Sequence, residues 1–511
     1  MATRSATRQA NAPVRTARAT PARPARARRP RPATPGPAPA AERMSKVDTA
    51  WLRMDGEANL MLITGVWTLR PRIRWQDLCL RVQERLLRYD RFRQRVQHDA
   101  TGARWVDDSD FDIARHVLRE HLPRHGRRPA QEALQARVGE LAMQPLDAAH
   151  PLWQMHLVED YEGGSALIIR VHHCIGDGIA LIHVILSLVD GGDAPPPRPR
   201  RPPAEAAEDW VLQSLLRPAT DLTLRALGAA GQRAASAIAL LREPKHGLEA
   251  SGEIARLGVQ VVQDALALLL MPDDTPTRLK GRPAASKRVA WCPPLPLDEV
   301  KAVGRALNCS VNDVLLSCVA GAIGEYLRAQ GDAVDGAEIR AMVPVNLRPL
   351  DEAHQLGNRF GLVPLVLPVG MANPVERVYE VRKRMNALKG STQPLLAFLV
   401  LAVAGLLVKP AQDAILDLFG RKTTAVMTNV PGPREKLKFL GASLEQIMFW
   451  VPQSGNIGLG VSILSYGGGV QFGVISDTAL CPQPQQIIDR FEPEFAKLAM
   501  LALMLPWGEV D

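Results

Sequence analysis

The segment RVHHCIGDGIAL, residues 170–181, places four side chains that can do chemistry between two apolar runs. His172, His173 and Cys174 follow one another, and Asp177 stands between two glycines. If the stretch before them forms a strand, alternate residues face opposite sides of the sheet, so the two histidines point apart. Diverging side chains cannot ligate one metal ion, and the sequence has no H-E-x-x-H or clustered Cys/His motif elsewhere. The sequence therefore predicts a site that uses no metal.

A single histidine at the end of a strand can act as a general base. Free imidazole has a pKa of about 6.5, so His173 can take the proton of an alcohol that attacks a thioester, without a covalent intermediate. Asp177 is expected to hold the turn, by capping the next helix or by pairing with an arginine, and Gly178 permits a close backbone approach. A histidine pair that only packs in the core is the open alternative. The sequence contains no G-x-S-x-G pentapeptide or P-loop, which disfavours serine hydrolysis and nucleotide binding.

Three residues outside this segment stand in recognisable local patterns. Ser-x-x-Asp at residues 310–313 has the spacing of a capping box, so Asn312 is expected near the start of a helix. Asn429, in TNVPGP, has the surroundings of a turn residue. Trp153 is expected to pack in the core.

The elements around the motif alternate between helical and strand patterns. A short helix and a strand are expected within residues 45–69, then helical spacing from Trp75 through Leu87, and strands at 154–160 and 166–173. The stretch after residue 190 is dense in proline and charge, which is typical of a linker. Strand and helix patterns resume at Val289. Mixed patterns in both halves predict an α/β (α+β) fold of two domains with the active site between them.

The sequence thus divides into four predicted parts. These are a tail over 1–43, an N-terminal domain over 44–190, a linker and helical connection over 191–288, and a C-terminal domain over 289–511. The six cysteines are scattered without a C-x-x-C pair, which favours reduced thiols.

The formal net charge of +9 is concentrated in the tail. Residues 1–43 contain ten arginines and a single acidic residue, Glu42, whereas the rest of the chain has 52 basic and 52 acidic residues. This Ala/Pro/Arg-rich composition predicts a disordered tail, either merely solvated or attracted to an anionic membrane surface, and predicts no specific nucleic-acid partner. The apolar run 395–408 is fourteen residues long and the run 495–507 thirteen. Both are shorter than the roughly 20 residues that span a bilayer, so we expect core helices or interfacial segments.

Several motifs resemble the bacterial wax ester synthase/acyl-CoA:diacylglycerol acyltransferase family, within the coenzyme A-dependent acyltransferase superfamily. HHCIGDG has the H-H-x-x-x-D-G form, SKVDTAWLRMD resembles the D-x-x-[FW]-L opening, and PLDAAHPLW resembles the stretch upstream of the histidines. Four further segments occur in the order of that family: SVNDVLLSCVAGAIGEYL, VPVNLRP, GNRFGLVPLVLP and MTNVPGPREKLKFLGASLEQIMFWVP. Asp55 is a departure, because the family commonly has glutamate there.

The resemblance implies two chloramphenicol acetyltransferase-like domains with the active site in the channel between them. It implies His173 as general base, with His172, Asp177 and Gly178 in supporting roles, and Asn312 and Asn429 near the substrate. The substrates it implies are acyl-CoA and a long-chain alcohol or diacylglycerol, with no cofactor.

No apolar h-region follows the N-terminal arginines, so a secretory signal peptide is not expected, and neither apolar run is long enough to span a bilayer. We therefore expect a cytoplasmic enzyme in peripheral contact with the inner face of the membrane or with lipid inclusions. Two alternatives stay open: a condensation-type acyltransferase with a carrier-bound donor, and a non-catalytic scaffold of lipid droplets.

Overall fold

The structure is a computed structural model that describes residues 42–99, 102–122, 129–193, 271–347, 356–389 and 420–504. Residues 1–41 of the predicted tail, 194–270 of the predicted connection and the apolar run 395–408 lie outside the described residues. The predicted tail boundary at residue 43 is wrong by two residues. Strand β1 (Glu42–Arg43) pairs with Trp105 and Arg104, so backbone hydrogen bonds incorporate both residues into the fold.

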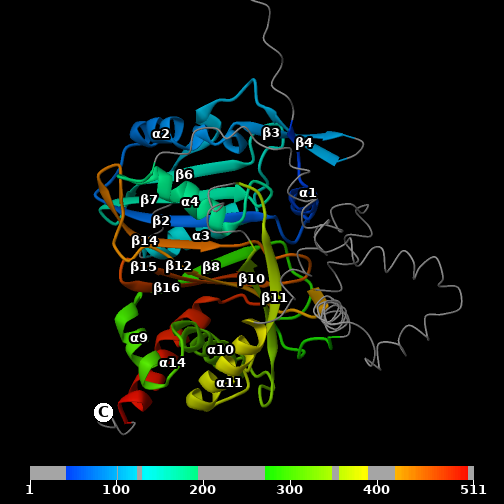
Figure 1. Cartoon of the computed structure of the whole chain (residues 1–511), viewed down its shortest axis with the longest axis vertical. Helices are drawn as coiled ribbons and strands as arrows, with labels where there is room; N and C mark the ends of the chain where they lie inside the picture. Colours follow the sequence, from blue (N-terminus) through cyan, green and yellow to red (C-terminus); the bar gives the residue numbers. More distant parts are fainter. Residues whose placement is uncertain are drawn as a thin grey trace, which may run out of the picture. The chain divides into compact units, whose positions relative to one another are not determined.

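Six strands form a sheet around the motif, in the order β13-β14-β2-β7-β6-β5 (Figure 1). They are β2 (Leu62–Arg70), β5 (Val117–Glu120), β6 (Trp153–Tyr161), β7 (Gly164–His172), β13 (Lys438–Phe439) and β14 (Ala442–Trp450). The strands predicted at 154–160 and 166–173 are found as β6 and β7, except that β7 ends at His172 and leaves His173 in the following turn. Burial of every residue of β7 explains its nearly continuous apolar run.

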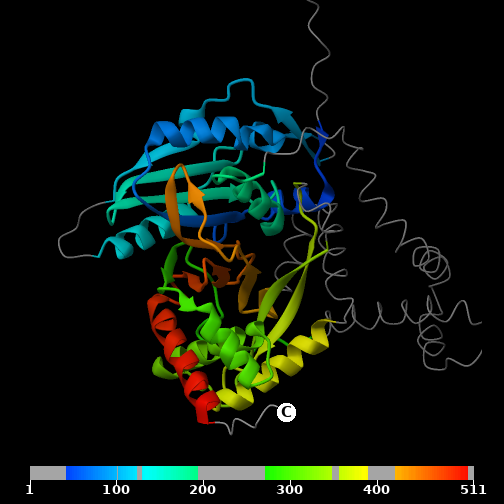
Figure 2. The same cartoon turned by 60° about the vertical axis from the view of Figure 1, so that its left-hand side comes forward.

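Helices cover both faces of this sheet (Figure 2). α2 (Trp75–Glu84) and α4 (Gly178–Leu188) pack on the face that carries Trp67, and α3 (Ala130–Ala142) packs on the face that carries Val66. The helical spacing predicted through Leu87 is wrong at its end. α2 ends at Glu84, and the chain continues in a 3-10 turn, η1 (Leu86–Arg88), that buries Leu86 in the core.

The elements before and beside this sheet are short. α1 (Lys46–Arg53) precedes β2, and β1, β4 and β3 form a separate three-stranded sheet. The remaining bounds are β3 (Gln94–Asp99), β4 (Gly102–Asp107), η2 (Asp90–Phe92) and η3 (Ile113–Arg115).

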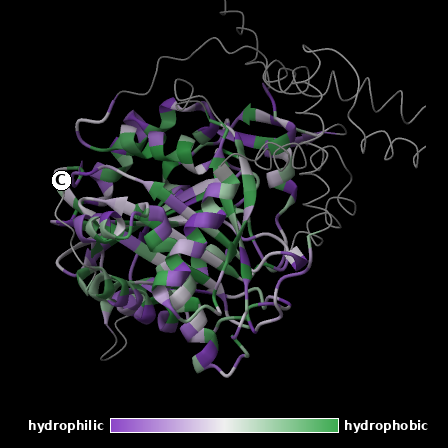
Figure 3. Cartoon of the chain, turned by 60° about the horizontal axis from the view of Figure 1, so that its bottom comes forward, coloured by the Kyte–Doolittle hydropathy of each residue, from purple (hydrophilic) through white to green (hydrophobic). Residues whose placement is uncertain are grey.

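A second sheet has the order β11-β10-β12-β15-β16-β8, with β9 paired to β16. Its strands are β8 (Lys287–Trp291), β9 (Leu295–Pro296), β10 (Ile339–Asn346), β11 (Phe360–Leu367), β12 (Ala425–Pro431), β15 (Leu459–Tyr466) and β16 (Gly469–Asp477). The helices that share its apolar core are α9 (Leu297–Ala306), α10 (Val311–Ala329), α11 (Pro374–Lys389) and α14 (Gln485–Met504). Figure 3 shows both hydrophobic and hydrophilic residues on the helices.

The division between the two halves does not follow the chain order that the sequence suggested. The predicted C-terminal domain begins at residue 289, yet its strands β13 and β14 belong to the N-terminal sheet, where β14 pairs antiparallel with β2. This pairing gives hydrogen-bond partners to the backbone N–H and C=O groups at the edge of β2. Local sequence patterns do not reveal the pairing. The two halves are therefore interlocked through residues 438–450.

Candidate active site

The motif fills the turn between a buried strand and a helix. β7 ends at His172, and α4 begins at Gly178. Asp177 is the helix N-cap, because its Oδ1 accepts a hydrogen bond of 2.9 Å from the Ala180 N–H. The predicted capping role of Asp177 is confirmed. Its Oδ2 accepts from the backbone N–H of Arg359 at 2.9 Å, so the same carboxylate also holds the segment before β11.

His173 is clamped between the two halves of the chain. Its ring stacks on Trp51 of α1 with centroids 4.1 Å apart, and Phe360 of β11 lies 5.5 Å away on centroids. The backbone N–H of His173 donates to the Met61 carbonyl at 2.7 Å, and its carbonyl accepts from Asn358 Nδ2 at 2.8 Å. Contacts on the ring and on both backbone groups fix the position of this side chain.

The environment of His173 keeps its ring neutral. Only 3% of the residue is exposed, and burial lowers the pKa of His173 to about 4, against the opposing effect of the Asp177 carboxylate. Its Nδ1 is buried and has no hydrogen-bond partner among the described residues. At neutral pH the imidazole therefore has an unprotonated nitrogen that can accept a proton.

His172 faces a different set of groups. The Cys174 N–H donates to His172 Nδ1 at 3.1 Å, so that nitrogen acts as an acceptor and the ring proton is placed on Nε2. Nε2 lies 3.4 Å from Asp55 Oδ2, and Asp55 Oδ1 accepts from the Met61 N–H at 2.6 Å. The two histidines thus have separate neighbours, as strand alternation predicted. No group of three or more His, Cys, Asp or Glu side chains in the described part of the chain is arranged to hold a metal ion.

Asn358 and Asp48 complete the site, although local sequence patterns predict a role for neither. Asn358 Nδ2 donates both to Asp48 Oδ1 and to the His173 carbonyl, each at 2.8 Å, and the Asn358 N–H donates to Asp48 Oδ1 at 3.1 Å. Burial raises the pKa of Asp48, although the Arg91 guanidinium, 3.5 Å from its carboxylate, opposes this effect. One buried amide therefore connects α1, the motif and the segment before β11.

The sequence did contain a signal for these residues. Asp48 and Trp51 are the Asp and Trp of the D-x-x-[FW]-L segment, and Asn358 belongs to GNRF; both segments resemble the family. Trp51 and Asn358 contact His173, and Asp48 contacts Asn358. These contacts join three segments that are far apart in the chain, so local spacing could not assign the roles.

The two predicted asparagines contact one another instead of the motif. Asn429 Nδ2 donates to Asn312 Oδ1 at 3.0 Å, and no hydrogen bond within the described ranges joins this pair to His173. The capping box between Ser310 and Asp313 is confirmed. The interpretation of Asn429 as a turn residue is wrong, since it lies in β12, where the parallel ladder with β15 extends to Pro431.

Trp153 and Cys174 are both buried in the core. Trp153 is fully buried, and its Nε1 donates to the Phe92 carbonyl at 2.9 Å, which confirms core packing. Cys174, within the motif, is also fully buried, and all six cysteines are unpaired.

Replacing Asp177 tests whether it holds the turn. We expect Asp177→Ala to lower the free energy of unfolding by about 2 kcal/mol, because it removes a helix cap and leaves the Arg359 N–H without its acceptor. Activity should fall together with stability. Asp177→Asn keeps one side-chain acceptor, so its free energy of unfolding should lie between those of the wild type and Asp177→Ala. Urea unfolding followed by circular dichroism, beside kcat/KM, checks this; lost activity at unchanged stability would instead indicate a direct chemical role.

The fold is shared with solved structures of other proteins. A wax ester synthase/diacylglycerol acyltransferase from Marinobacter aquaeolei VT8 superposes with a TM-score of 0.61 and 21% identity, covering 91% of this chain and 100% of that chain. The first condensation domain of the calcium-dependent antibiotic synthetase superposes with a TM-score of 0.56 and 14% identity, covering 91% and 97%. The fold is therefore the predicted two-domain, chloramphenicol acetyltransferase-like fold.

Sequence comparison identifies the family. Residues 44–315 match the wax ester synthase/diacylglycerol acyltransferase catalytic domain, and residues 356–499 match the C-terminal domain of the same family. The chain belongs to the wax ester synthase/diacylglycerol acyltransferase family and is an acyltransferase. A probable diacylglycerol O-acyltransferase of Mycobacterium tuberculosis strain H37Rv is 27% identical over 430 residues, which cover 82% of this chain and 87% of that protein. A second one from the same strain is 28% identical over 437 residues, covering 81% and 89%.

Proposed function

We propose that this acyltransferase moves a fatty acyl group from acyl-CoA directly to the hydroxyl of a long-chain alcohol or a diacylglycerol, with His173 as the general base. The observation that carries the proposal is the buried, neutral imidazole of His173, clamped by Trp51 and Asn358 within the family motif. Membership of the family supports the substrate class. No cofactor is required, because acyl-CoA itself supplies the activated acyl group.

The proposed reaction proceeds in two balanced steps. The acceptor hydroxyl gives its proton to the unprotonated ring nitrogen of His173 as its oxygen attacks the thioester carbonyl carbon. The tetrahedral intermediate then collapses, the carbon–sulfur bond breaks, and the imidazolium returns the proton to the departing thiolate of coenzyme A. The products are an ester and free coenzyme A, and His173 ends in its starting form.

The neighbouring residues have separate proposed roles. His172 and Asp55 brace the backbone on one side of His173, and Asp177 fixes the turn on the other. Gly178 leaves open space, since an added Cβ would meet no atom within 4 Å, which allows the substrate to approach the start of α4. The paired amides of Asn312 and Asn429 remain candidate substrate contacts. A channel between the two halves remains part of this proposal.

Product analysis tests the function directly. Purified protein is given palmitoyl-CoA with either hexadecanol or dipalmitoylglycerol, and the lipids formed are identified by mass spectrometry. We expect wax ester, triacylglycerol or both. Turnover only with a carrier-protein-bound donor would favour the condensation-type alternative, and no ester from any donor would favour the non-catalytic scaffold.

We also propose a cytoplasmic location, in peripheral contact with the inner face of the membrane or with lipid inclusions. Hydrophobic acceptors and the arginine-rich N-terminus support this location. Three exposed apolar side chains at the end of α14 add to the argument: Met500, Leu503 and Met504. Within the described residues no single helix is long and apolar enough to cross a bilayer, although α9 and α10 would pass as a pair that bends by 98°.

Deleting residues 1–41 tests the role of the arginines. The nine arginines in this segment are its only charged residues, and the deletion leaves β1 intact. We expect weaker co-sedimentation with anionic vesicles, with the larger difference at low salt, because exposed charges are screened within roughly 10 Å at 0.1 M. Turnover with short-chain, soluble substrates should stay within about threefold, under ~1 kcal/mol of barrier. Equal vesicle binding by both proteins at every salt concentration would rule out this role.

A further inference from the structure

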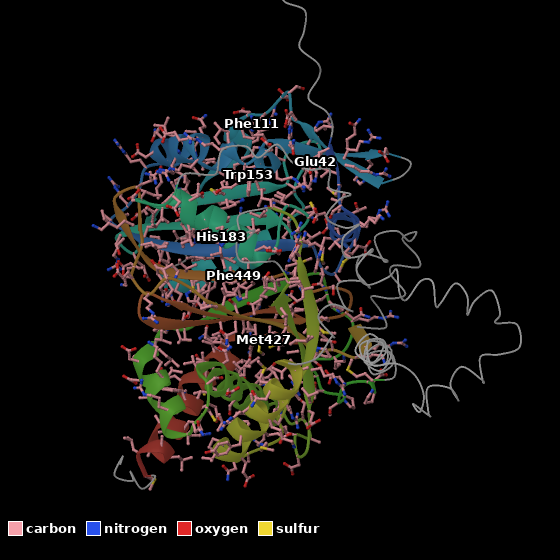
Figure 4. All side chains as sticks on the ribbon, viewed as in Figure 1. Glu42, Phe111, Trp153, His183, Met427 and Phe449 are labelled. Atoms are coloured by element: carbon pink, nitrogen blue, oxygen red, sulfur yellow. The ribbon has the colours of Figure 1, made fainter. Side chains whose placement is uncertain are left out.

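An apolar cavity lies between α4 and the first sheet. Its floor is formed by β2 and β7, its cover by α4, and one side by β14 and the loop that contains Gly432 and Pro433. Phe449 on β14 lines it, and His183 marks α4 in Figure 4. Nearly all of the lining side chains are apolar, so water that entered would find few hydrogen-bond partners.

The cavity reaches the motif from both sides. Val171, just before the two histidines, and Gly178, just after Asp177, both belong to its wall. It is a pocket of the site described above, yet none of the residues assigned to proton transfer lines it. A ligand that filled it would therefore lie beside the reaction centre without being the reacting group.

We propose that this cavity binds a long hydrocarbon chain of one substrate, and that Gly65 determines how long that chain can be. The proposal rests on the proposed function, because the chain must belong to the acyl donor or to the lipid acceptor. Both sources present the same chemistry, a flexible alkyl chain whose burial is favoured by about the same amount for each methylene.

Gly65 is singled out by its position and its backbone. It lies in the interior of β2 between Ile63 and Trp67, and all three residues line the cavity. Its φ is not among the positive values, so the backbone does not require glycine. An added Cβ would meet the Met448 carbonyl oxygen at 3.5 Å and no other atom closer than 3.9 Å, which is ordinary contact. Glycine inside a strand marks a bulge, a bend or the close approach of a ligand or another backbone. The register of β2 with β14 is regular at Gly65, and Gly65 lines the cavity, which favours a ligand.

The decisive experiment measures chain-length profiles of Gly65→Ala and Gly65→Leu. One series varies the acyl-CoA from eight to eighteen carbons with a fixed acceptor, and the other varies the alcohol with a fixed donor. In one series, we expect Gly65→Leu to lower kcat/KM for sixteen carbons relative to ten by at least about tenfold, because the new side chain displaces roughly two methylenes. In the same series, Gly65→Ala should lower kcat/KM for sixteen carbons relative to ten by a smaller factor. The series that changes identifies which substrate occupies the cavity.

Thr64→Val is the matched control. Thr64 is the preceding residue of β2, faces the opposite side of the sheet, and has a buried hydroxyl with no partner in the described part of the chain. Its profiles should match those of the wild type. If folded, active Gly65→Leu retains both wild-type profiles, the cavity does not hold a substrate chain, although the proposed function stands. If the wild type itself forms no ester, the proposed function fails first. If Gly65→Leu does not fold, the shift in Gly65→Ala decides.

Discussion

His173→Ala is expected to lower kcat for ester formation by about 10²–10⁴-fold, which corresponds to about 3–5 kcal/mol of barrier. The affinity for acyl-CoA should change little, since the imidazole is proposed to act on the acceptor proton. His173→Phe is the companion variant, because an aromatic ring can retain the stack on Trp51 without supplying a base. Steady-state kinetics and acyl-CoA binding by calorimetry measure both effects. Full activity in either variant would indicate that the histidine pair only packs in the core.

Cys174→Ala is the control for covalent catalysis. The thiol lies directly beside His173 in sequence but is fully buried, so the direct mechanism passes no acyl group through it. This variant should remain active. A trapped acyl-cysteine, or a Cys174→Ala enzyme as inactive as His173→Ala, would contradict direct transfer.

The same histidine makes a prediction about pH. Because burial lowers the pKa of His173 to about 4, the base stays neutral as the pH falls from 8 to 5, and the acid limb of kcat/KM should lie well below 6.5. Stability behaves differently. Between pH 6.5 and 4 the unfolded chain protonates this histidine and the native protein does not, so the free energy of unfolding should decrease as the pH falls, by up to about 3 kcal/mol for this group. Brief assays after a pH jump separate the two effects, and an acid limb at 6.5 would contradict the buried, neutral base.

Asn358→Ala is expected to produce the second large effect. It removes both side-chain hydrogen bonds of Asn358, so the buried Asp48 carboxylate loses one of its donors and the His173 carbonyl loses its side-chain donor. We expect a loss of stability of about 2–4 kcal/mol and a fall in kcat of about 10–100-fold, with KM little changed. A merely structural residue would lower the amount of folded enzyme but not kcat per folded molecule.

Asn358→Asp supplies the contrast for this prediction. It is nearly isosteric but places a second carboxylate against Asp48, so it should be less stable than Asn358→Ala at neutral pH. Thermal unfolding of the two variants measures the order, and active-site titration corrects kcat for the folded fraction. Two results would contradict this role. Asn358→Asp could be more stable than Asn358→Ala, or Asn358→Ala could have the wild-type kcat per folded molecule. Either result would show that Asn358 does not position His173.

The sequence by itself determined the features that depend on neighbours within a few residues. Alternation along β7 separated His172 from His173, and the spacing of Asp177 before α4 and of Ser310 before Asp313 predicted two helix caps that the structure contains. These predictions succeed because the side chain and the backbone group that it contacts lie within one turn of the same helix or within one strand.

Tertiary structure alone decided the contacts that make the site. Asn358 is 310 residues from Asp48 and 185 from His173, and β14 crosses to pair with β2. Asn429 was expected in a turn but lies in β12, because β12 pairs with β15 at this residue. Burial lowers the pKa of His173, and burial depends on which surfaces dock. Local periodicity specifies the apolar face of each element, but the partner of that face is set by the free energy of packing the whole chain.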